Sequence, residues 1–297
     1  MENTSGNILN EFFEEIYSEG AARSTVEAYR KDLTYFFKWY EEVNDQLQDP
    51  EQITSIDLRE YQNFLQNEKE LKPATINRRM AALEKYLKWV KQAGYISRLP
   101  NFPKTIREQK VPPKSLGRTE QNRLLREAEK RCNTRDFALL RLLMSCGLRV
   151  SEAVAIRLMD LDIGERHGQV IVRGKGNKWR EVPIPPDARK ALREWLAYRE
   201  LLPAYTNSPW LFPSRNGEYI SARYAEQVVK NLGQFAGLNI HPHILRHTAA
   251  TNMIRSGADL VTVAQVLGHS NLNTTAIYTK PGNYSVNHVA VAGAINL

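Results

Sequence analysis

The sequence predicts two mainly helical domains, the second of which contains a small β-hairpin. Apolar residues recur at helical spacing along most of the 297-residue chain. Alternating apolar residues, the pattern of half-buried strands, begin after Asp162. A proline-rich stretch without an apolar period follows Leu99. These patterns place a helical domain at residues 1–107, a linker at residues 108–116 and a second domain at residues 117–297.

Two amphipathic helices are expected in the first domain. Residues 24–27, Ser-Thr-Val-Glu, match a capping box that opens the first helix. Pro73 opens the second helix, which stops near Gly94. The residues expected in the core are Tyr29, Leu33, Phe36, Phe37 and Tyr40 of the first helix and Ile76, Met80, Leu83, Leu87 and Val90 of the second.

The charge is distributed unevenly along the chain. Residues 1–71 carry 6 basic and 16 acidic side chains, residues 72–110 carry 10 and 2, and residues 111–297 carry 25 and 15, for a net charge of +8. A basic block after an acidic start suggests a polyanionic partner, with a solvated basic surface as the alternative. Five side chains of the second helix are candidates for phosphate contacts: Arg78, Arg79, Lys85, Lys88 and Lys91.

The composition is that of a globular cytoplasmic protein. Hydrophobic residues make up 42% of the chain, which is enough for packed cores. No apolar run approaches the roughly 20 residues of a membrane helix, and residues 1–10 lack the pattern of a signal peptide. Cys132 and Cys146 lie in helical patterns and are consistent with a reducing compartment. We therefore expect no membrane partner.

The second domain is expected to begin with helices after a linker stiffened by prolines. Thr119 is the expected N-cap of a helix at about 120–131, and a helix at about 135–146 ends at Gly147. Arg149 then lies in a short connection, where two helices would brace it, although an ordinary surface arginine is the alternative. Ser151 and Glu152 suit the start of the next helix. The linker prolines are Pro100, Pro103, Pro112 and Pro113.

A β-hairpin with glycines at its tip is expected next. Val170 and Val172 alternate on one strand, Val182 and Ile184 on the other, and residues 174–177 form the turn. A lysine at such a tip is usually exposed to solvent and has no catalytic role. Two further helices, at about 186–200 and 221–236, are expected to act as scaffold.

Chemically versatile side chains gather between residues 241 and 280. His243 and Arg246 are three positions apart near the start of an expected helix, so both point the same way. His269 follows a helix stop at Gly268, and Tyr278 lies nine residues further. Arginine binds phosphate through a rigid fork, histidine transfers protons near neutral pH, and tyrosine can act as a covalent nucleophile. This set favours phosphoryl transfer over purely structural roles.

Zinc binding by His243 and His247, four positions apart, is the alternative for this helix. Arg246 lies between them and would repel the cation, and the glutamate of an HExxH motif is lacking. We therefore expect no metal site.

Several of these segments resemble the signature motifs of the tyrosine recombinases, the phage integrase and Xer group. The segments are His243-Ile-Leu-Arg246-His247, Leu267-Gly268-His269-Ser270 and Ile277-Tyr278-Thr279, together with residues 147–152, Gly-Leu-Arg-Val-Ser-Glu, and residues 174–178, Gly-Lys-Gly-Asn-Lys. The resemblance implies a two-domain, C-shaped DNA clamp with a catalytic set of Arg149, Lys175, His243, Arg246, His269 and Tyr278, all present and in order. Lys178 is the alternative to Lys175 if the register differs.

The resemblance also implies site-specific DNA recombination through a 3′-phosphotyrosyl intermediate formed by Tyr278, without metal or nucleotide cofactor. Lys175 would be the general acid. Relaxation of DNA by a type IB topoisomerase and a catalytically silent DNA-binding accessory protein are the alternatives. Dimer resolution of the Xer type and integration, excision or cointegrate resolution by a mobile element both fit.

Residues 281–297 contain no Asp, Glu, Lys or Arg and several apolar side chains, which is typical of a segment that docks. In the resembled family this region packs into a neighbouring subunit. The expected partners are thus a double-stranded DNA recombination site and three further copies, or a related recombinase, with tails exchanged in a tetramer. Docking of the tail on its own subunit is the alternative.

Overall fold

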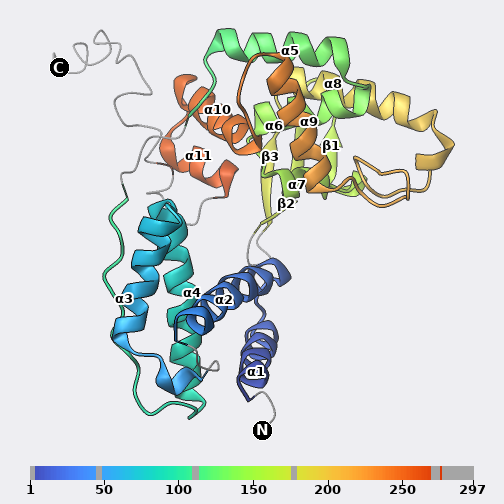
Figure 1. Cartoon of the computed structure of the whole chain (residues 1–297). Coiled ribbons are helices and arrows are strands. Elements are labelled where there is room, and N and C mark those ends of the chain that lie inside the picture. Colours follow the sequence, from blue (N-terminus) through green and yellow to red (C-terminus); the bar gives the residue numbers. More distant parts are fainter. Residues whose placement is uncertain (1–3, 45–48, 109–113, 175–178, 269–274, 276–297) are drawn as a thin grey trace, which may run out of the picture. The chain divides into compact units, whose positions relative to one another are not determined.

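The computed structural model describes residues 4–44, 49–108, 114–174, 179–268 and 275. The chain divides into two compact units, residues 1–110 and 111–297 (Figure 1). Among the described residues, no helix is both long and apolar enough to cross a membrane. The predicted mainly helical two-domain fold, with a small antiparallel sheet in the second domain, is confirmed.

The first unit is a helical bundle with an aromatic core. Its long helices α2 and α4 pack against each other, and α1 packs against both. The fully buried side chains include Phe12, Phe36, Phe37, Tyr61 and Tyr86, and Phe37 meets Tyr86 edge to face at 5.6 Å between ring centroids. The elements are α1 (Thr4–Ser18), α2 (Arg23–Asn44), the short helix η1 (Pro50–Gln52), α3 (Ser55–Asn63), the π-helical turn η2 (Phe64–Glu68) and α4 (Pro73–Gln92).

The predicted capping box at residues 24–27 is wrong. Helix α2 already begins at Arg23, so Ser24 lies inside its first turn. The carboxylate of Glu27 accepts a hydrogen bond from Arg23 Nε at 3.3 Å, an ion pair at i and i+4 on an exposed surface.

The chain just before the linker is hydrogen-bonded to the first unit, and the last linker residue is hydrogen-bonded to the second. The amide of Asn77 donates to the carbonyl of Ile106 at 2.8 Å and accepts from its N–H at 2.9 Å. At the other end, the backbone N–H of Leu116 donates to the Thr248 hydroxyl at 2.9 Å. Pro112 and Pro113 lie outside the described residues.

The second unit combines helices with a three-stranded antiparallel sheet. Helix α6 packs against α8, α9 and α10, with Leu139, Leu143 and Trp195 buried between elements. The elements are α5 (Arg118–Arg131), α6 (Thr134–Cys146), α7 (Val150–Val154), η3 (Leu158–Asp160), β1 (Leu161–Ile163), β2 (Gly168–Arg173), β3 (Trp179–Pro183), α8 (Pro186–Glu200), η5 (Pro203–Tyr205), α9 (Ala222–Phe235), α10 (Pro242–Arg255) and α11 (Leu260–Leu267).

The sheet confirms the predicted hairpin and adds a strand. In the β2–β3 pair, Val170 is opposite Val182, and both side chains are fully buried. Strand β1, which the sequence analysis missed, pairs with β2 on the other side. Helix α7 packs against β2 and helix α11 against β3, so the sheet lies beside both helices (Figure 1).

The start of α5 differs from the prediction. Gly117, not Thr119, is the N-cap, and the Glu120 carboxylate accepts from the Gly117 N–H at 2.8 Å. This contact is the N3-carboxylate half of a capping box, and glycine has no side chain to form the other half. The predicted ends of α6 at Gly147 and of α11 at Gly268 are confirmed, since both glycines have left-handed φ values of +64° and +69°.

Candidate active site

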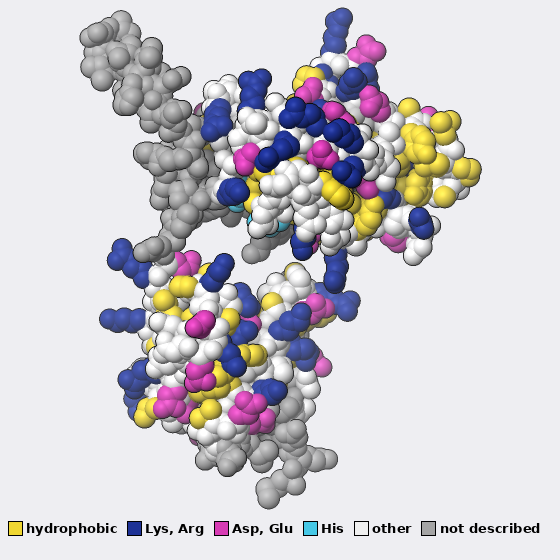
Figure 2. Space-filling view, turned by 45° about the horizontal axis from the view of Figure 1, so that its top comes forward, with side chains coloured by type: hydrophobic (Ala, Val, Ile, Leu, Met, Phe, Trp, Pro, Cys, Tyr) yellow, Lys and Arg dark blue, Asp and Glu magenta, His cyan; other side chains and the backbone are white. Residues whose placement is uncertain are grey.

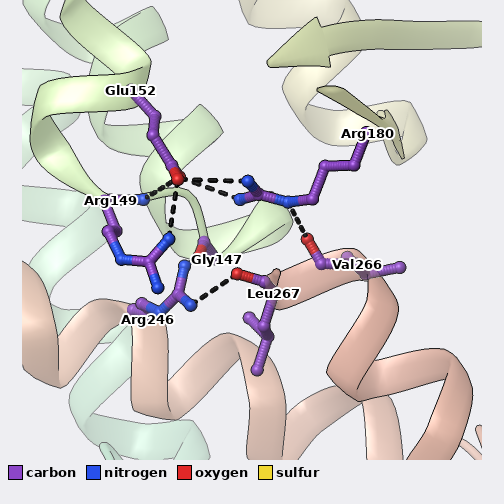
Figure 3. A network of polar contacts seen from close by, with 7 residues as sticks. All are labelled: Gly147, Arg149, Glu152, Arg180, Arg246, Val266 and Leu267. Carbon is purple, nitrogen blue, oxygen red and sulfur yellow. Dashed lines mark hydrogen bonds and ion pairs between the residues drawn. The ribbon is translucent and has the colours of Figure 1, made fainter. Parts of the chain in front are cut away.

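The buried guanidinium of Arg246 joins the ends of two helices. Arg246 lies near the start of α10 and is 4% exposed. Its Nη1 donates to the carbonyl of Gly147 at 2.7 Å, and its Nη2 donates to the carbonyl of Leu267 at 2.6 Å. The last carbonyls of a helix lack partners within that helix, so they are available to hold a guanidinium. Arg246 is thereby fixed at the C-terminal ends of α6 and α11 (Figure 3).

Gly147 allows these helix ends to approach closely. A Cβ atom at this position would lie 2.8 Å from Leu267 Cδ2 and 3.2 Å from the Cβ of Ala249. Its φ of +64° is also unfavourable for residues with a side chain. Both the backbone conformation and the packing therefore require glycine two residues before Arg149.

Arg149 is held by the carboxylate of Glu152. As the N-cap of α7, it donates from its backbone N–H to Glu152 Oε2 at 2.9 Å and from Nη1 to Oε1 at 2.7 Å. The Arg149 side chain is 37% exposed, whereas that of Glu152 is 5% exposed. Of the described residues, only Glu152 accepts from this guanidinium. Its remaining N–H groups are thus available to an anion.

Arg180 on strand β3 shares the same carboxylate. Its Nη1 and Nη2 donate to the two Glu152 oxygens at 3.1 and 2.8 Å, and its Nε donates to the carbonyl of Val266 at 2.8 Å (Figure 3). Burial alone would raise the pKa of Glu152, but the hydrogen bonds from Arg180 and Arg149 outweigh burial and hold the pKa below its usual value. Glu152 is therefore ionised near neutral pH.

His243 occupies the first turn of α10, three positions before Arg246, as predicted. Its pKa is lowered because the site partly desolvates the ring and because His241, Arg246 and Arg149 add positive charge nearby. A neutral imidazole near pH 7 can accept a proton. His247, one turn further, is more buried, and its pKa falls to about 4 for the same kind of reason.

The described part of the site carries net positive charge. Arg149 and Arg180 share a single carboxylate, that of Glu152, and Arg246 adds a third guanidinium. His243 is mainly neutral. Within the described residues, no group of three or more His, Cys, Asp or Glu side chains is arranged to hold a metal ion. Such a site is suited to binding a phosphate through two of its oxygens.

The structure brings together three of the six predicted catalytic residues: Arg149, His243 and Arg246. Lys175, the alternative Lys178, His269 and Tyr278 lie outside the described residues. Sequence reasoning missed Arg180 and gave Glu152 only a role at the start of a helix. Alternation on β3 could have indicated Arg180, because it places this residue on the same face as Val182.

The five predicted DNA-binding residues all lie on α4, but they do not share one face of the helix. Arg78 and Arg79 both pair with Asp32 of α2, and Arg79 stacks over the ring of Tyr35 at 4.0 Å. Burial raises the pKa of Asp32 even though these two arginines oppose the shift.

The three lysines of α4 remain largely accessible. Lys88 pairs with Glu84 at 2.6 Å, Lys85 lies over the Tyr29 ring at 5.4 Å, and Lys91 is exposed. Figure 2 shows basic side chains spread over one face of each unit, with acidic side chains between them. Arg79 differs from these lysines, because its contacts with Asp32 and Tyr35 make it part of the packing between α2 and α4.

Two family models match the chain. The phage integrase family matches residues 114–283, and the phage integrase N-terminal SAM-like domain matches residues 9–94. Tyrosine recombinase XerC of Xanthomonas axonopodis pv. citri is 36% identical over 268 residues, which cover 86% of this chain and 85% of the relative.

Solved structures share the fold. A XerH site-specific recombinase bound to a palindromic difH substrate gives a TM-score of 0.76 at 24% identity and covers 97% of this chain and 83% of the other. A lambda integrase tetramer bound to a Holliday junction gives 0.71 at 16% identity, covering 92% and 76%. The chain therefore belongs to the phage integrase family and is a tyrosine site-specific recombinase of the Xer type, an enzyme that breaks and rejoins DNA strands.

Proposed function

We propose that Arg149 and Arg246 bind the nonbridging oxygens of the scissile phosphodiester while Tyr278 attacks phosphorus. A bond forms between the Tyr278 oxygen and phosphorus as the bond between phosphorus and the 5′ oxygen breaks. His243 accepts the phenol proton, Lys175 gives a proton to the departing 5′ oxygen, and His269 donates a hydrogen bond to the phosphate. The products are a 3′-phosphotyrosine and a free 5′-hydroxyl.

The rejoining step is the reverse reaction on a partner strand. The 5′-hydroxyl oxygen of that strand bonds to phosphorus as the bond between phosphorus and the Tyr278 oxygen breaks. Lys175 accepts the hydroxyl proton, and Tyr278 leaves with the proton returned by His243. One phosphodiester bond is exchanged for another, so the bond energy is kept in the protein–DNA linkage. The reaction therefore needs no nucleotide, and the arginines supply the positive charge that stabilises the phosphate.

The fixed guanidinium of Arg246 is the observation that carries this proposal. Its hydrogen bonds to Gly147 and Leu267 hold it in place before any phosphate arrives. Because no reorganisation is then needed as charge grows on the phosphate, each such donor is worth about 10²–10³ in rate, or about 3–4 kcal/mol. Arg149, with free N–H groups beside the same helix end, supplies the second half of the clamp.

We further propose a division of labour between the two domains. Residues 1–107 bind the DNA core site through Arg78, Lys85, Lys88 and Lys91, while residues 117–297 carry the chemistry. The exposed positions of the lysines on α4 support phosphate contacts. The pairing of Arg78 with Asp32 means that phosphate must compete with a buried carboxylate for this arginine.

The assembly that acts on DNA is proposed to be a tetramer on two recombination sites in the cytoplasm. The lambda integrase with this fold is a tetramer on a Holliday junction, which supports such an arrangement. The uncharged residues 281–297 would pass from one subunit to the next around the ring. A related recombinase could replace some of the four copies.

A nicked suicide substrate tests this function. Duplexes carrying candidate core sites, each with a nick that lets a short strand diffuse away after cleavage, are incubated with wild type and with Tyr278→Phe. A covalent adduct with wild type alone, followed by ligation of an added 5′-hydroxyl strand, is the expected result. Tight binding of the core site without any adduct would refute the proposal.

A further inference from the structure

Arg180 connects three segments of the second unit through one guanidinium. Its side chain, on β3, is 13% exposed. It donates to both oxygens of Glu152 on α7 and, through Nε, to the carbonyl of Val266 on α11. Figure 3 shows the guanidinium lying between the carboxylate and the end of α11. Each of the three guanidinium nitrogens thus donates to an acceptor.

The strand register explains why an arginine points inward here. Arg180 is opposite Val172 in the β2–β3 pair and lies on the same face as buried Val182. The next pair along, Arg173 and Trp179, lies on the outer face, and Trp179 is 57% exposed. Burying a guanidinium is costly unless it is paired and hydrogen-bonded, and Glu152 meets this requirement.

The end of α11 is shaped to receive the guanidinium. A Cβ atom on Gly268 would lie 2.9 Å from both Cζ and Nη1 of Arg180 and 3.1 Å from its Nε. With a side chain at position 268, the Arg180 guanidinium would have to shift away from this helix end. The contact is therefore a tight packing contact as well as a hydrogen bond to Val266.

The residues that make these contacts are near three of the proposed catalytic residues in the sequence. Glu152 is three residues from Arg149 and hydrogen-bonded to it, and Gly268 directly precedes His269. Lys175 is five residues before Arg180 in the sequence, between the end of β2 at Arg173 and the start of β3 at Trp179. The hairpin base is thus tied to the phosphate clamp by Glu152 and not only by strand pairing.

We propose that Arg180 is a positioning residue for strand cleavage: it locks the base of the β2–β3 hairpin to Glu152 and to α11, so that Lys175 reaches the departing 5′ oxygen. This inference rests on the proposed role of Lys175 as general acid. Removal of Arg180 leaves Arg149 paired with Glu152, so the phosphate clamp is retained and proton delivery is lost. An arginine is required because its rigid plane serves three acceptors, whereas a lysine has one ammonium group.

A substrate with sulfur in place of the bridging 5′ oxygen at the scissile phosphate tests this role. A thiolate leaves without a proton, so this substrate bypasses the general acid. Single-turnover cleavage of the oxygen and sulfur substrates is compared for wild type, Lys175→Ala, Arg180→Lys and Arg180→Gln, with thermal unfolding and DNA affinity measured in parallel. Arg173→Lys, on the outer face of the same hairpin base, is the matched control.

Arg180→Lys and Arg180→Gln are expected to cleave the oxygen substrate about 100-fold more slowly, the usual cost of misplacing a catalytic group by about 1 Å. DNA affinity is expected to change less than twofold, since Arg180 is buried. Sulfur should restore both variants, as it restores Lys175→Ala, to within a few-fold of wild type. Arg173→Lys should cleave both substrates like wild type.

Equal losses on the two substrates in either Arg180 variant would overturn the inference, as would full activity on the oxygen substrate. Rescue of Lys175→Ala without rescue of Arg180→Lys would refute the positioning role alone. Failure of sulfur to rescue Lys175→Ala would refute the general-acid role of Lys175, and the inference with it. Adduct formation at Tyr278 is scored separately, so tyrosine-mediated cleavage stands or falls on its own.

Discussion

Arg246 donates a hydrogen bond of 2.7 Å to the carbonyl of Gly147, the residue that ends α6 two positions before Arg149. This contact ties the two proposed phosphate-binding arginines together although they are 97 positions apart in the sequence. The geometry of the clamp therefore depends on a helix end as much as on the arginines themselves.

Gly147→Ala is expected to lower both stability and cleavage. The left-handed backbone and the clash with Leu267 together should cost about 3 kcal/mol of unfolding free energy, measured by urea denaturation. Gly257→Ala is the control, because Gly257 has a φ of +91° but nothing within 4 Å of its Cβ position. That variant should lose only about 1 kcal/mol. Equal losses in the two would show that packing against α11 contributes nothing.

Glu152→Gln is expected to destabilise the protein by about 3 kcal/mol at pH 7, because the largely buried guanidinium of Arg180 and the partly exposed one of Arg149 lose their counterion. The folded state lowers the pKa of Glu152 below its usual 4.5, so its contribution is complete above pH 4.5 and is lost as pH falls through the lowered pKa. The difference from wild type should thus shrink on acidification.

Urea titrations between pH 3 and 7 measure this change. Glu181→Gln, an exposed carboxyl on β3 next to Arg180, is the control and should alter stability by less than about 0.5 kcal/mol. A difference between wild type and Glu152→Gln that stays constant down to pH 3 would contradict the assignment of an ionised, hydrogen-bonded Glu152.

The pH dependence of cleavage should reflect His243. Partial desolvation and the charges of His241, Arg246 and Arg149 lower its pKa below 6.5. The neutral, proton-accepting ring therefore persists into mildly acidic solution, and the rate should fall only below the usual histidine range. Single-turnover rates from pH 5 to 8 measure this fall in rate at low pH, which His243→Gln should abolish. A midpoint at or above 6.5 in wild type would contradict the proton-acceptor role.

Deletion of residues 285–297 should separate DNA binding from assembly. The tail has no Lys or Arg side chain to contact phosphate, so binding of one protomer to a half-site should be unchanged in gel-shift titrations. Formation of the tetramer on two sites, followed by analytical ultracentrifugation, should be reduced. A tetramer of undiminished stability would exclude exchange of tails between subunits.

Local signals in the sequence were sufficient for most elements. Gly147 and Gly268 marked helix ends because a left-handed residue after an apolar run is a short-range feature. Alternation of Val170, Val172 and Val182 identified the hairpin for the same reason. Strand β1, with three residues, is too short for an alternating pattern to be recognised.

The relationships that depend on tertiary packing could not be predicted in this way. The sharing of Glu152 by Arg149 and Arg180 joins residues from two elements, and a sequence pattern does not show which acceptor a buried arginine will find. The pairing of Arg78 and Arg79 with Asp32 has the same origin. Residue types and their order thus predicted the chemistry, whereas the contacts that position the side chains required the fold.

The most direct test is the identification of the residue joined to DNA. Trapped adduct from a suicide substrate is digested with trypsin and nuclease, and the modified peptide is sequenced by mass spectrometry. We expect a phosphotyrosine at Tyr278, attached to the 3′ end of the cleaved strand, with a 5′-hydroxyl on the released strand. Attachment to any other residue, or through a 5′-phosphate, would contradict the proposed mechanism.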